Sequence, residues 1–223
     1  MKGKLLIRAL VKFLLGVVLV GVLVFLPAGT LNYWNGWLFM GVLFVPMLVA
    51  GIVLMVKNPQ LLEKRLNGKE EESEQKTVVL LSGIMFLVGF VLCGLNYRFS
   101  WVVLPDWIVI LATVLFVAAY VLYAEVMREN AYLSRTIEVQ EGQTVVDTGL
   151  YGIVRHPMYS VTIGLFLTMP LILGSLISFG IFLVYPLILV KRIKNEEKVL
   201  EENLQGYKEY KKKVKYRLLP FVW

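Results

Sequence analysis

Gly149-Leu-Tyr-Gly-Ile-Val-Arg-His-Pro-Met-Tyr159 is a short polar stretch between long apolar runs, and it holds His156, the single histidine of the chain. Pro157 precedes an apolar run. Because proline has no N–H to lose and its fixed φ suits a first helical turn, a helix is predicted to begin there. The free N–H groups of that turn, Arg155 and His156 would then converge on one small volume, which favours an anionic group such as a carboxylate or phosphate. Taken alone, these residues also fit a simple helix cap.

Composition places the chain in a membrane. Its residues are 58% hydrophobic and its mean hydropathy is +0.71, above the usual range for a soluble domain. Segments of about twenty residues without charge are long enough to cross a bilayer as helices. We expect an all-α integral membrane protein with its first four spans at 10–26, 35–56, 78–97 and 107–127. The first span leads at once to the second, so it is expected to be a retained anchor and not a cleaved leader.

The apolar stretch 158–190 is too long for one crossing. Pro170 and Gly174-Ser175 interrupt it, which predicts two short helices in a hairpin. The expected architecture is therefore about five to six transmembrane helices, the last two forming this hairpin, with a C-terminal region in the cytoplasm.

Charged residues are strongly segregated along the chain. All lysines and arginines except Arg98 lie in the same four segments as all carboxylates except Asp106. These segments are 1–12, 57–77, 124–160 and 191–223. The positive-inside rule places them, and both termini, in the cytoplasm. The net charge of +7 then indicates orientation and contact with anionic lipid.

The ligands for a metal site are missing from the sequence. Cys93 is the single cysteine, which excludes a disulfide within the chain and a thiolate metal site. With a single histidine as well, the other ligands of a catalytic metal would all have to be carboxylates, so no metal is expected. Transport is disfavoured because no ionisable residue lies at mid-membrane in any predicted span.

Two connections between spans have recognisable patterns. The segment from Lys57 to Leu66 is predicted to form a short interfacial helix with basic residues near lipid headgroups. Residues 135–140 and 144–147 alternate around a glycine turn, which predicts a small β-hairpin or a pair of extended strands.

The tail begins with a predicted helix over 191–204, followed by Tyr207 and Tyr210, which would share a helix face. The basic run 211–213 is predicted to lie on anionic lipid. Glu196 and Glu197 stand where the last helix leaves the membrane. Carboxylates at that depth are unfavourable unless they have cationic or hydroxyl partners, so such partners are expected.

Four blocks of sequence, taken together and in order, resemble the isoprenylcysteine carboxyl methyltransferase family and its phospholipid methyltransferase relatives. They are Asn130-Ala-Tyr-Leu-Ser-Arg-Thr-Ile137, Arg155-His-Pro-x-Tyr159, Glu196-Glu197, and Gly206-Tyr-x-x-Tyr210 followed by Arg217-Leu-Leu-Pro220. The similarity covers roughly residues 120–223. It implies transmembrane helices over 1–123 and a catalytic region over 124–223. No Gly-x-Gly-x-x-Gly follows a predicted strand, so a Rossmann-type methyltransferase is excluded.

The resemblance implies S-adenosylmethionine as cofactor. The residues expected to bind it are Tyr151, Arg155, His156, Pro157, Tyr159, Glu196, Glu197 and Tyr207. The helix start suits the cofactor's carboxylate, and one acidic residue suits the ribose hydroxyls. Tyrosine faces suit the adenine or the sulfonium cation.

Methyl transfer from a sulfonium is an in-line displacement, so the protein must mainly align the reactants and exclude water. A carboxylate or thiolate acceptor needs only a steering cation, for which Arg192 and Arg217 are the candidates and Arg135 the third. A phospholipid amine would need a base. The candidate bases are Glu196, Glu197 and His156. An acceptor with a lipid tail would reach the site sideways, between helices, from the cytoplasmic leaflet.

Two other classes stay open. Membrane sterol or enone reductases, which use NADPH, resemble the same C-terminal half. They usually have more spans, and a 2′-phosphate site favours clustered arginines, which are scattered here. A small membrane scaffold with a basic lipid-binding tail is the non-enzymatic alternative. It would leave the glutamate pair and the His-Pro turn without a role.

Overall fold

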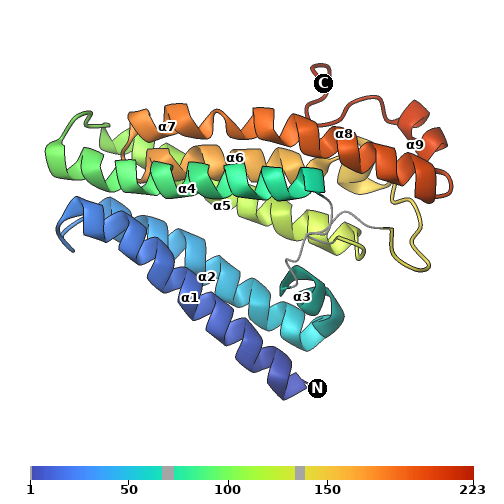
Figure 1. The fold of residues 1–223 in the computed structure, drawn as a ribbon, viewed down its shortest axis with the longest axis horizontal. Helices are drawn as coiled ribbons and strands as arrows, with labels where there is room; N and C mark the ends of the chain where they lie inside the picture. Colours follow the sequence, from blue (N-terminus) through green and yellow to red (C-terminus); the bar gives the residue numbers. More distant parts are fainter. Residues whose placement is uncertain (1, 67–72, 134–138) are drawn as a thin grey trace.

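The computed structural model describes residues 2–66, 73–133 and 139–223, and these residues form a bundle of helices (Figure 1). The four long helices of the first half are α1 (Lys2–Ala28), α2 (Trp34–Lys57), α4 (Ser73–Phe99) and α5 (Asp106–Glu129). They coincide with the four predicted spans. Each is long and apolar enough to cross a membrane.

The predicted hairpin is present, and its second arm is longer than expected. Its helices are α6 (Pro157–Ile172), α7 (Leu176–Phe182) and α8 (Tyr185–Asn203). The break at Gly174-Ser175 is confirmed, with Gly174 in the left-handed region at φ +73°. Pro170 was expected to break the chain as well, but it lies in the last turn of α6, and the helix continues beyond it. Because α8 follows α7 almost directly, residues 176–203 form a fifth candidate span.

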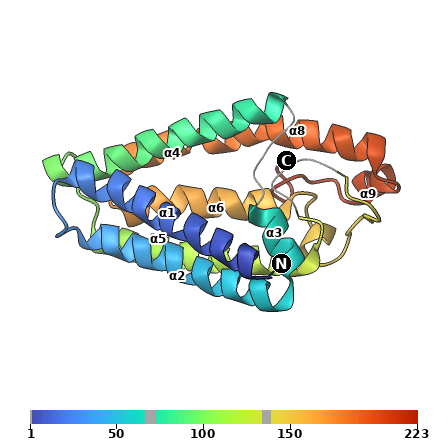
Figure 2. The ribbon, with the colours of Figure 1, turned by 60° about the horizontal axis from the view of Figure 1, so that its bottom comes forward.

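The first arm of the hairpin, α6, packs into the middle of the bundle, and the second arm lies at its edge (Figures 1 and 2). Helix α6 lies against α5, while α7 and α8 run along α4 on the other side (Figures 1 and 2). The core between them is aromatic, with the ring of Phe90 5.6 Å from Phe39 and 6.1 Å from Phe182. Large apolar side chains are exposed along the outer faces of α1, α2, α4 and α5. Such faces are those of helices that contact lipid.

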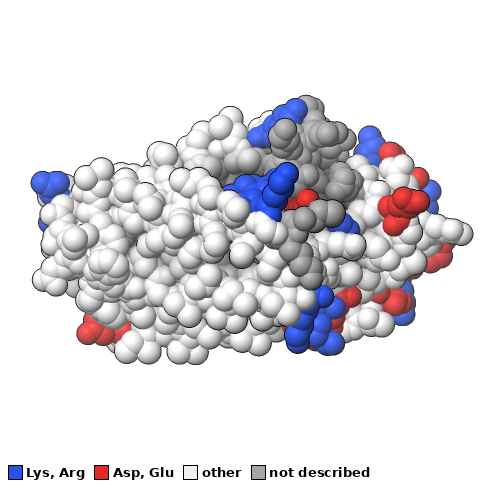
Figure 3. All heavy atoms as spheres, turned by 90° about the horizontal axis from the view of Figure 1, so that it is seen from below, with Lys and Arg blue, Asp and Glu red and all other residues white. Residues whose placement is uncertain are grey.

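The two ends of the bundle differ in charge. Both termini lie toward one end, and the charged side chains gather there (Figures 1 and 3). We call this the charged end. It holds α3 (Pro59–Leu66), the 3-10 turn η1 (Gly149–Gly152) and α9 (Tyr207–Lys213), as well as the end of α8. The opposite end consists of the turns 29–33, 100–105 and 173–175. Its charged residues are Arg98 and Asp106, which flank the second turn, and we call it the uncharged end for its lack of other charges. The predicted division of charge is therefore confirmed, as are the short helix after Lys57 and the helical tail.

The expected β-hairpin is absent from the described part of its segment. Residues 139–148 contain no strand and turn at Gly142, whose φ is +71°. Side chains satisfy the backbone in place of a ladder: Gln143 Oε1 accepts from Gln140 N at 2.9 Å, and Gln140 Nε2 donates to Tyr132 O at 2.7 Å. The rest of that prediction, and Arg135, lie at 134–138, outside the described residues.

Candidate active site

The turn before α6 is fixed to the end of α5. Gly149 has a left-handed φ of +52°, and a Cβ there would lie 1.5 Å from a carboxylate oxygen of Glu129. That carboxylate accepts a hydrogen bond from Leu150 N at 2.9 Å. Helix α6 then begins at Pro157, as predicted. His156 is the N-cap residue of α6, and its side chain makes no cap hydrogen bond.

Residues 214–218, which we call the C-terminal strap, lie along this turn. Arg155 N donates to Tyr216 O and His156 N donates to Arg217 O, each at 2.9 Å. The Arg155 guanidinium reaches further along the strap, with Nη1 2.7 Å from the carbonyl oxygens of Val214 and Lys215. The strap has no regular secondary structure, so these contacts define its position.

Glu197 of α8 joins the helix, the turn and the strap. Its side chain is 3% exposed. Oε1 lies 2.7 Å from Arg155 Nε and 3.3 Å from His156 Nε2, and Oε2 lies 3.0 Å from Arg217 Nε. Lys211 Nζ is a more distant neighbour at 3.8 Å. A buried carboxylate is tolerated only with such partners, and removing one of them is costly. We call Glu197, Arg155, His156 and Arg217 the ion-pair hub.

A cavity of about 300 Å³ lies beside the hub. Helices α3, α4, α6, α8 and α9 contribute to its wall together with the segment 130–133 that follows α5, the turn and the segment 143–146. Its polar and aromatic lining residues are Arg65, Asn130, Tyr132, Gln143, Thr144, Tyr151, Arg155, His156, Tyr159, Thr162, Arg192, Glu196, Tyr207 and Tyr210. The cavity therefore combines ionic groups with several ring faces.

Tyr159 connects two charged residues of α8 on the cavity wall. Its hydroxyl donates to Glu196 Oε2 at 2.5 Å and accepts from Arg192 Nε at 2.8 Å. The Arg192 guanidinium also lies 5.9 Å from the centre of the Tyr159 ring. Arg192 and Glu196 are four residues apart and share a helix face. Tyr159 thus holds a cation and an anion in fixed places beside the cavity.

Tyr207 supplies a buried hydroxyl without a partner. Its side chain is 4% exposed and lines the cavity, and its Oη has no hydrogen bond partner among the described residues. Burial, with Glu197 and Glu196 nearby, raises the pKa of Tyr207, so it stays a neutral phenol. Burial also raises the pKa of Tyr151, which lines the same cavity. An unpaired buried hydroxyl is costly, and a bound ligand would relieve that cost.

Of the residues predicted from sequence, most line this cavity. These are Tyr151, Arg155, His156, Tyr159, Arg192, Glu196 and Tyr207. Glu197 and Arg217 lie behind the wall and face each other, and Pro157 supports the helix start. The other polar and aromatic lining residues were not predicted as site residues: Arg65, Asn130, Tyr132, Gln143, Thr144, Thr162 and Tyr210. The place of Arg65 in the predicted interfacial helix was a usable signal, whereas Gln143 and Thr144 had none.

Comparison with known proteins finds one matching family. Residues 107–202 match the isoprenylcysteine carboxyl methyltransferase (ICMT) family. This part of the chain is similar to that family. The ICMT match includes the turn, Tyr159 and the charged stretch of α8, while Arg65, Tyr207 and Arg217 lie outside it. The resemblance seen in the sequence is confirmed.

The chain is also similar to a protein of a second class. A 91-residue stretch is 31% identical to Delta(14)-sterol reductase from Mus musculus. The match covers 40% of this chain and 22% of the reductase, so the chain corresponds to less than a quarter of that curated relative.

Proposed function

We propose that this protein is an S-adenosylmethionine-dependent methyltransferase of the membrane, acting on a lipidic or small hydrophobic acceptor. The match of residues 107–202 to the ICMT family supports methyl transfer. The observation that carries the proposal is the cavity beside Glu196, in which the buried Tyr207 hydroxyl has no partner among the described residues. Five helices apolar enough to cross a membrane agree with a hydrophobic acceptor.

The chemistry of the cavity wall suits the cofactor. A volume of about 300 Å³ is at the lower end of the range for small-molecule pockets. Glu196 and the Tyr207 hydroxyl would bond the ribose and adenine polar groups, and the Tyr151 face would lie against the adenine or the sulfonium. Arg155 Nε and Nη1 are engaged with Glu197 and the strap, which leaves Nη2 for the carboxylate.

The helix start offers fewer donors than the sequence predicted. Tyr159 N and Ser160 N both donate to His156 O, at 3.0 and 3.3 Å. We therefore assign recognition of the cofactor's carboxylate to Arg155 and His156 more than to the α6 dipole.

When bound, S-adenosylmethionine supplies an activated methyl group on a sulfonium cation. Tyrosine rings around the cavity would exclude water and face that positive charge. Arg192, oriented by Tyr159, would steer a carboxylate or thiolate acceptor, and Glu196 would take the proton of an amine acceptor. Isoprenylcysteine-type carboxylate methylation is the default for this family, with phospholipid N-methylation or thiol S-methylation as alternatives. Arg217 would act through Glu197 and not on the acceptor.

Calorimetric titration of the full chain in detergent tests the proposal. S-adenosylmethionine and S-adenosylhomocysteine should bind, and Glu196→Gln should weaken both. Glu202→Gln is the matched control, since Glu202 lies on the same helix away from this cavity. Transfer of a labelled methyl group to lipid extract would then identify the acceptor. Absence of binding by both compounds to folded protein would overturn the proposal.

The similarity to Delta(14)-sterol reductase favours a second candidate, reduction with NADPH. NADPH is therefore titrated into the same preparation. Binding of NADPH without binding of the two methyl-cycle compounds would assign the cavity to reduction. If none of the three ligands binds, the non-enzymatic alternative, a small membrane scaffold, is favoured.

A further inference from the structure

A second cavity, of about 250 Å³, opens between α8 and α9, and the proposed methyl transfer does not use it. Its lining residues are all charged: Lys194, Glu197, Lys198, Glu201, Glu202, Lys208, Lys211 and Arg217. Glu197 and Arg217 belong to the ion-pair hub, which separates this cavity from the first one. We call it the α8–α9 pocket.

The pocket is lined by more cationic side chains than take part in ion pairs among the described residues. Arg217 is paired with Glu197, and Lys211 with Glu201. Lys194, Lys198 and Lys208 are exposed, and no carboxylate of the described residues lies within ion-pair distance of any of them. Glu202 is a further carboxylate of the lining, and no ion pair is found for it among the described residues. Three ammonium groups outnumber this one carboxylate, so the pocket is a site for an anion with several oxygens, such as a phosphate.

The depth of the pocket matches that of lipid headgroups. At 1.5 Å per residue, about 20 residues cross a hydrocarbon core of about 30 Å. Counted from Leu176, the start of α7, the core ends close to Lys194 on the candidate span 176–203. Lys198 lies one turn further, on the same helix face. The lysines of α8 therefore lie at the boundary and in the headgroup layer.

An apolar tip stands beside the pocket. Residues 219–222 expose Leu219 at 56%, Phe221 at 87% and Val222 at 76%. The tip is held in place, because Arg217 N and Leu218 N donate to Trp223 O at 2.8 and 2.9 Å. The Trp223 ring also lies 5.0 Å from the Arg217 guanidinium. Figure 1 shows the end of the chain standing out sideways beside α8, and not beyond the end of that helix.

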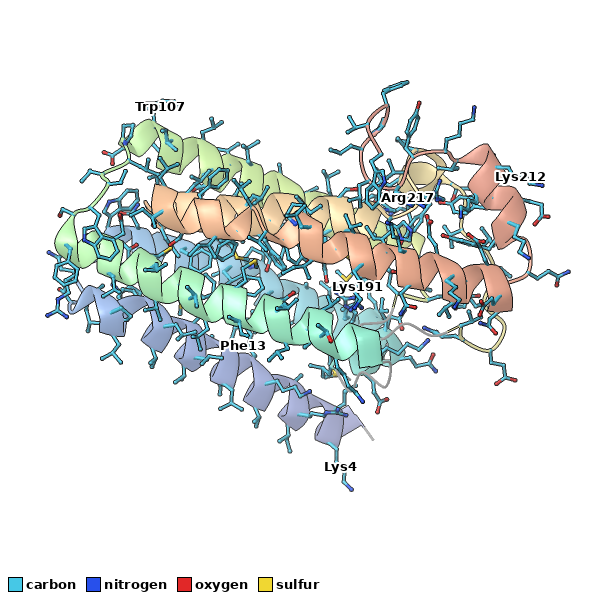
Figure 4. All side chains as sticks on the ribbon, turned by 45° about the horizontal axis from the view of Figure 1, so that its top comes forward. Lys4, Phe13, Trp107, Lys191, Lys212 and Arg217 are labelled. Atoms are coloured by element: carbon cyan, nitrogen blue, oxygen red, sulfur yellow. The ribbon has the colours of Figure 1, made fainter. Side chains whose placement is uncertain are left out.

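The labelled cationic side chains near α8 and α9 point in different directions. Figure 4 shows Lys212 of α9 pointing away from the bundle, whereas Arg217 lies inside, near the strap and α8. An ordered apolar group at the interface, next to unpaired lysines, is the combination that binds an anionic membrane surface.

We propose that the α8–α9 pocket binds the phosphate of an anionic phospholipid, with residues 219–222 inserted among the neighbouring acyl chains. The lipid would sit against α8 on the face of the hub opposite to the first cavity. This binding does not depend on methyl transfer.

Native mass spectrometry of the full chain in detergent tests the lysine part. Dioleoyl phosphatidylglycerol is expected to bind at least about fivefold more tightly than dioleoyl phosphatidylcholine. The variant Lys194→Gln/Lys198→Gln/Lys208→Gln should lose this preference. The matched control, Lys4→Gln/Lys57→Gln/Lys76→Gln, removes the same charge from exposed lysines at the same end and should keep it. Equal loss in both triple variants would overturn the proposal.

Two further measurements separate the lipid from other ligands. Inorganic phosphate is added as a competitor; if it displaces phosphatidylglycerol at equal concentration, the pocket is a small-anion site and the lipid assignment fails. A spin label at Phe221→Cys in phosphatidylglycerol nanodiscs reports depth, since Cys93 is buried. Higher accessibility to oxygen than to an aqueous nickel chelate is expected, and the reverse would overturn the insertion of the tip. Binding of S-adenosylmethionine is measured in the same variants, so that failure of the lipid proposal can be distinguished from failure of the proposed methyl transfer.

Discussion

Buried polar groups gather at both ends of the bundle. The two ends differ in whether these groups have hydrogen-bond partners among the described residues. At the uncharged end, Tyr33, Asn35 and Asn96 donate to the carbonyl oxygens of residues 173, 172 and 174. Asn96 also bonds Val102 through its oxygen at 3.1 Å and its nitrogen at 2.9 Å. We call these three side chains the turn clamp. The polar atoms of the turn clamp form hydrogen bonds that hold the turn between α6 and α7.

At the charged end the polar groups border open space. The ion-pair hub ties α8 to the turn and the strap, while Tyr159, Arg192, Glu196 and Tyr207 face the cavity. The Tyr207 hydroxyl has no partner among the described residues. The two ends show that burial of polar side chains alone does not indicate a ligand-binding site. A buried polar group that lacks a hydrogen-bond partner and lines a cavity does indicate one.

Breaking the hub should give the largest effect. Glu197→Gln keeps the shape of the side chain but leaves Arg155 buried without its counter-charge. The free energy of unfolding should fall by about 3–5 kcal/mol, and cofactor binding should be lost. Thermal unfolding in detergent measures the first and calorimetry the second. An unchanged melting temperature would show that the hub contributes little.

Breaking the turn clamp should lower stability without changing affinity. Asn96→Ala leaves two carbonyl oxygens and one N–H group without their partner. The expected loss is about 1–3 kcal/mol, because buried backbone groups are costly to leave unpaired. Titrated below its melting temperature, the variant should bind S-adenosylmethionine like the unmodified protein. A parallel loss of affinity would contradict the separation of the two ends.

Gly149→Ala tests the turn that positions the hub. The left-handed backbone costs about 1–2 kcal/mol with any side chain, and here the Cβ also displaces the Glu129 carboxylate. Gly142→Ala is the matched control, with a similar φ of +71° and no atom within 4 Å of its Cβ. Only the first variant should weaken cofactor binding. Equal affinities would place the turn outside the site.

Much of this arrangement could be predicted from sequence. Apolar length defines the spans, the segregation of charge defines the two ends, and the His-Pro pair defines the start of α6. These signals are local, since each depends on neighbouring residues in one stretch.

The roles of Glu196 and Glu197 could not be separated in this way. Successive residues on a helix point about 100° apart, so only one of the two can face the cavity. Which one does so depends on how α8 rotates against α6 and the strap. Arg217 was likewise predicted to face the acceptor, but the position of the strap turns it toward Glu197. The direction of each of these side chains is determined by tertiary packing, which cannot be read from a single sequence.

The smallest effect is expected from an exposed ion pair at the same end. Lys213 Nζ lies 2.7 Å from Asp147 Oδ2 and lowers the pKa of that carboxyl. A lowered pKa stabilises the fold above the unfolded-state pKa, and the contribution is lost as pH falls through the folded-state pKa. Because solvent screens the pair, Asp147→Asn should leave the melting temperature at pH 7 unchanged. A clear drop would show that exposed pairs support the charged end as well.

The most direct test of the cavity as a cofactor site is the titration of S-adenosylmethionine into Tyr207→Phe. This substitution removes one unpaired hydroxyl and leaves the ring in place. The ligand-free variant should be as stable as the unmodified protein or more so, because no hydrogen bond of the fold is lost. Its affinity should fall by about 1 kcal/mol, or roughly fivefold in Kd. A less stable ligand-free protein with unchanged affinity would contradict the account.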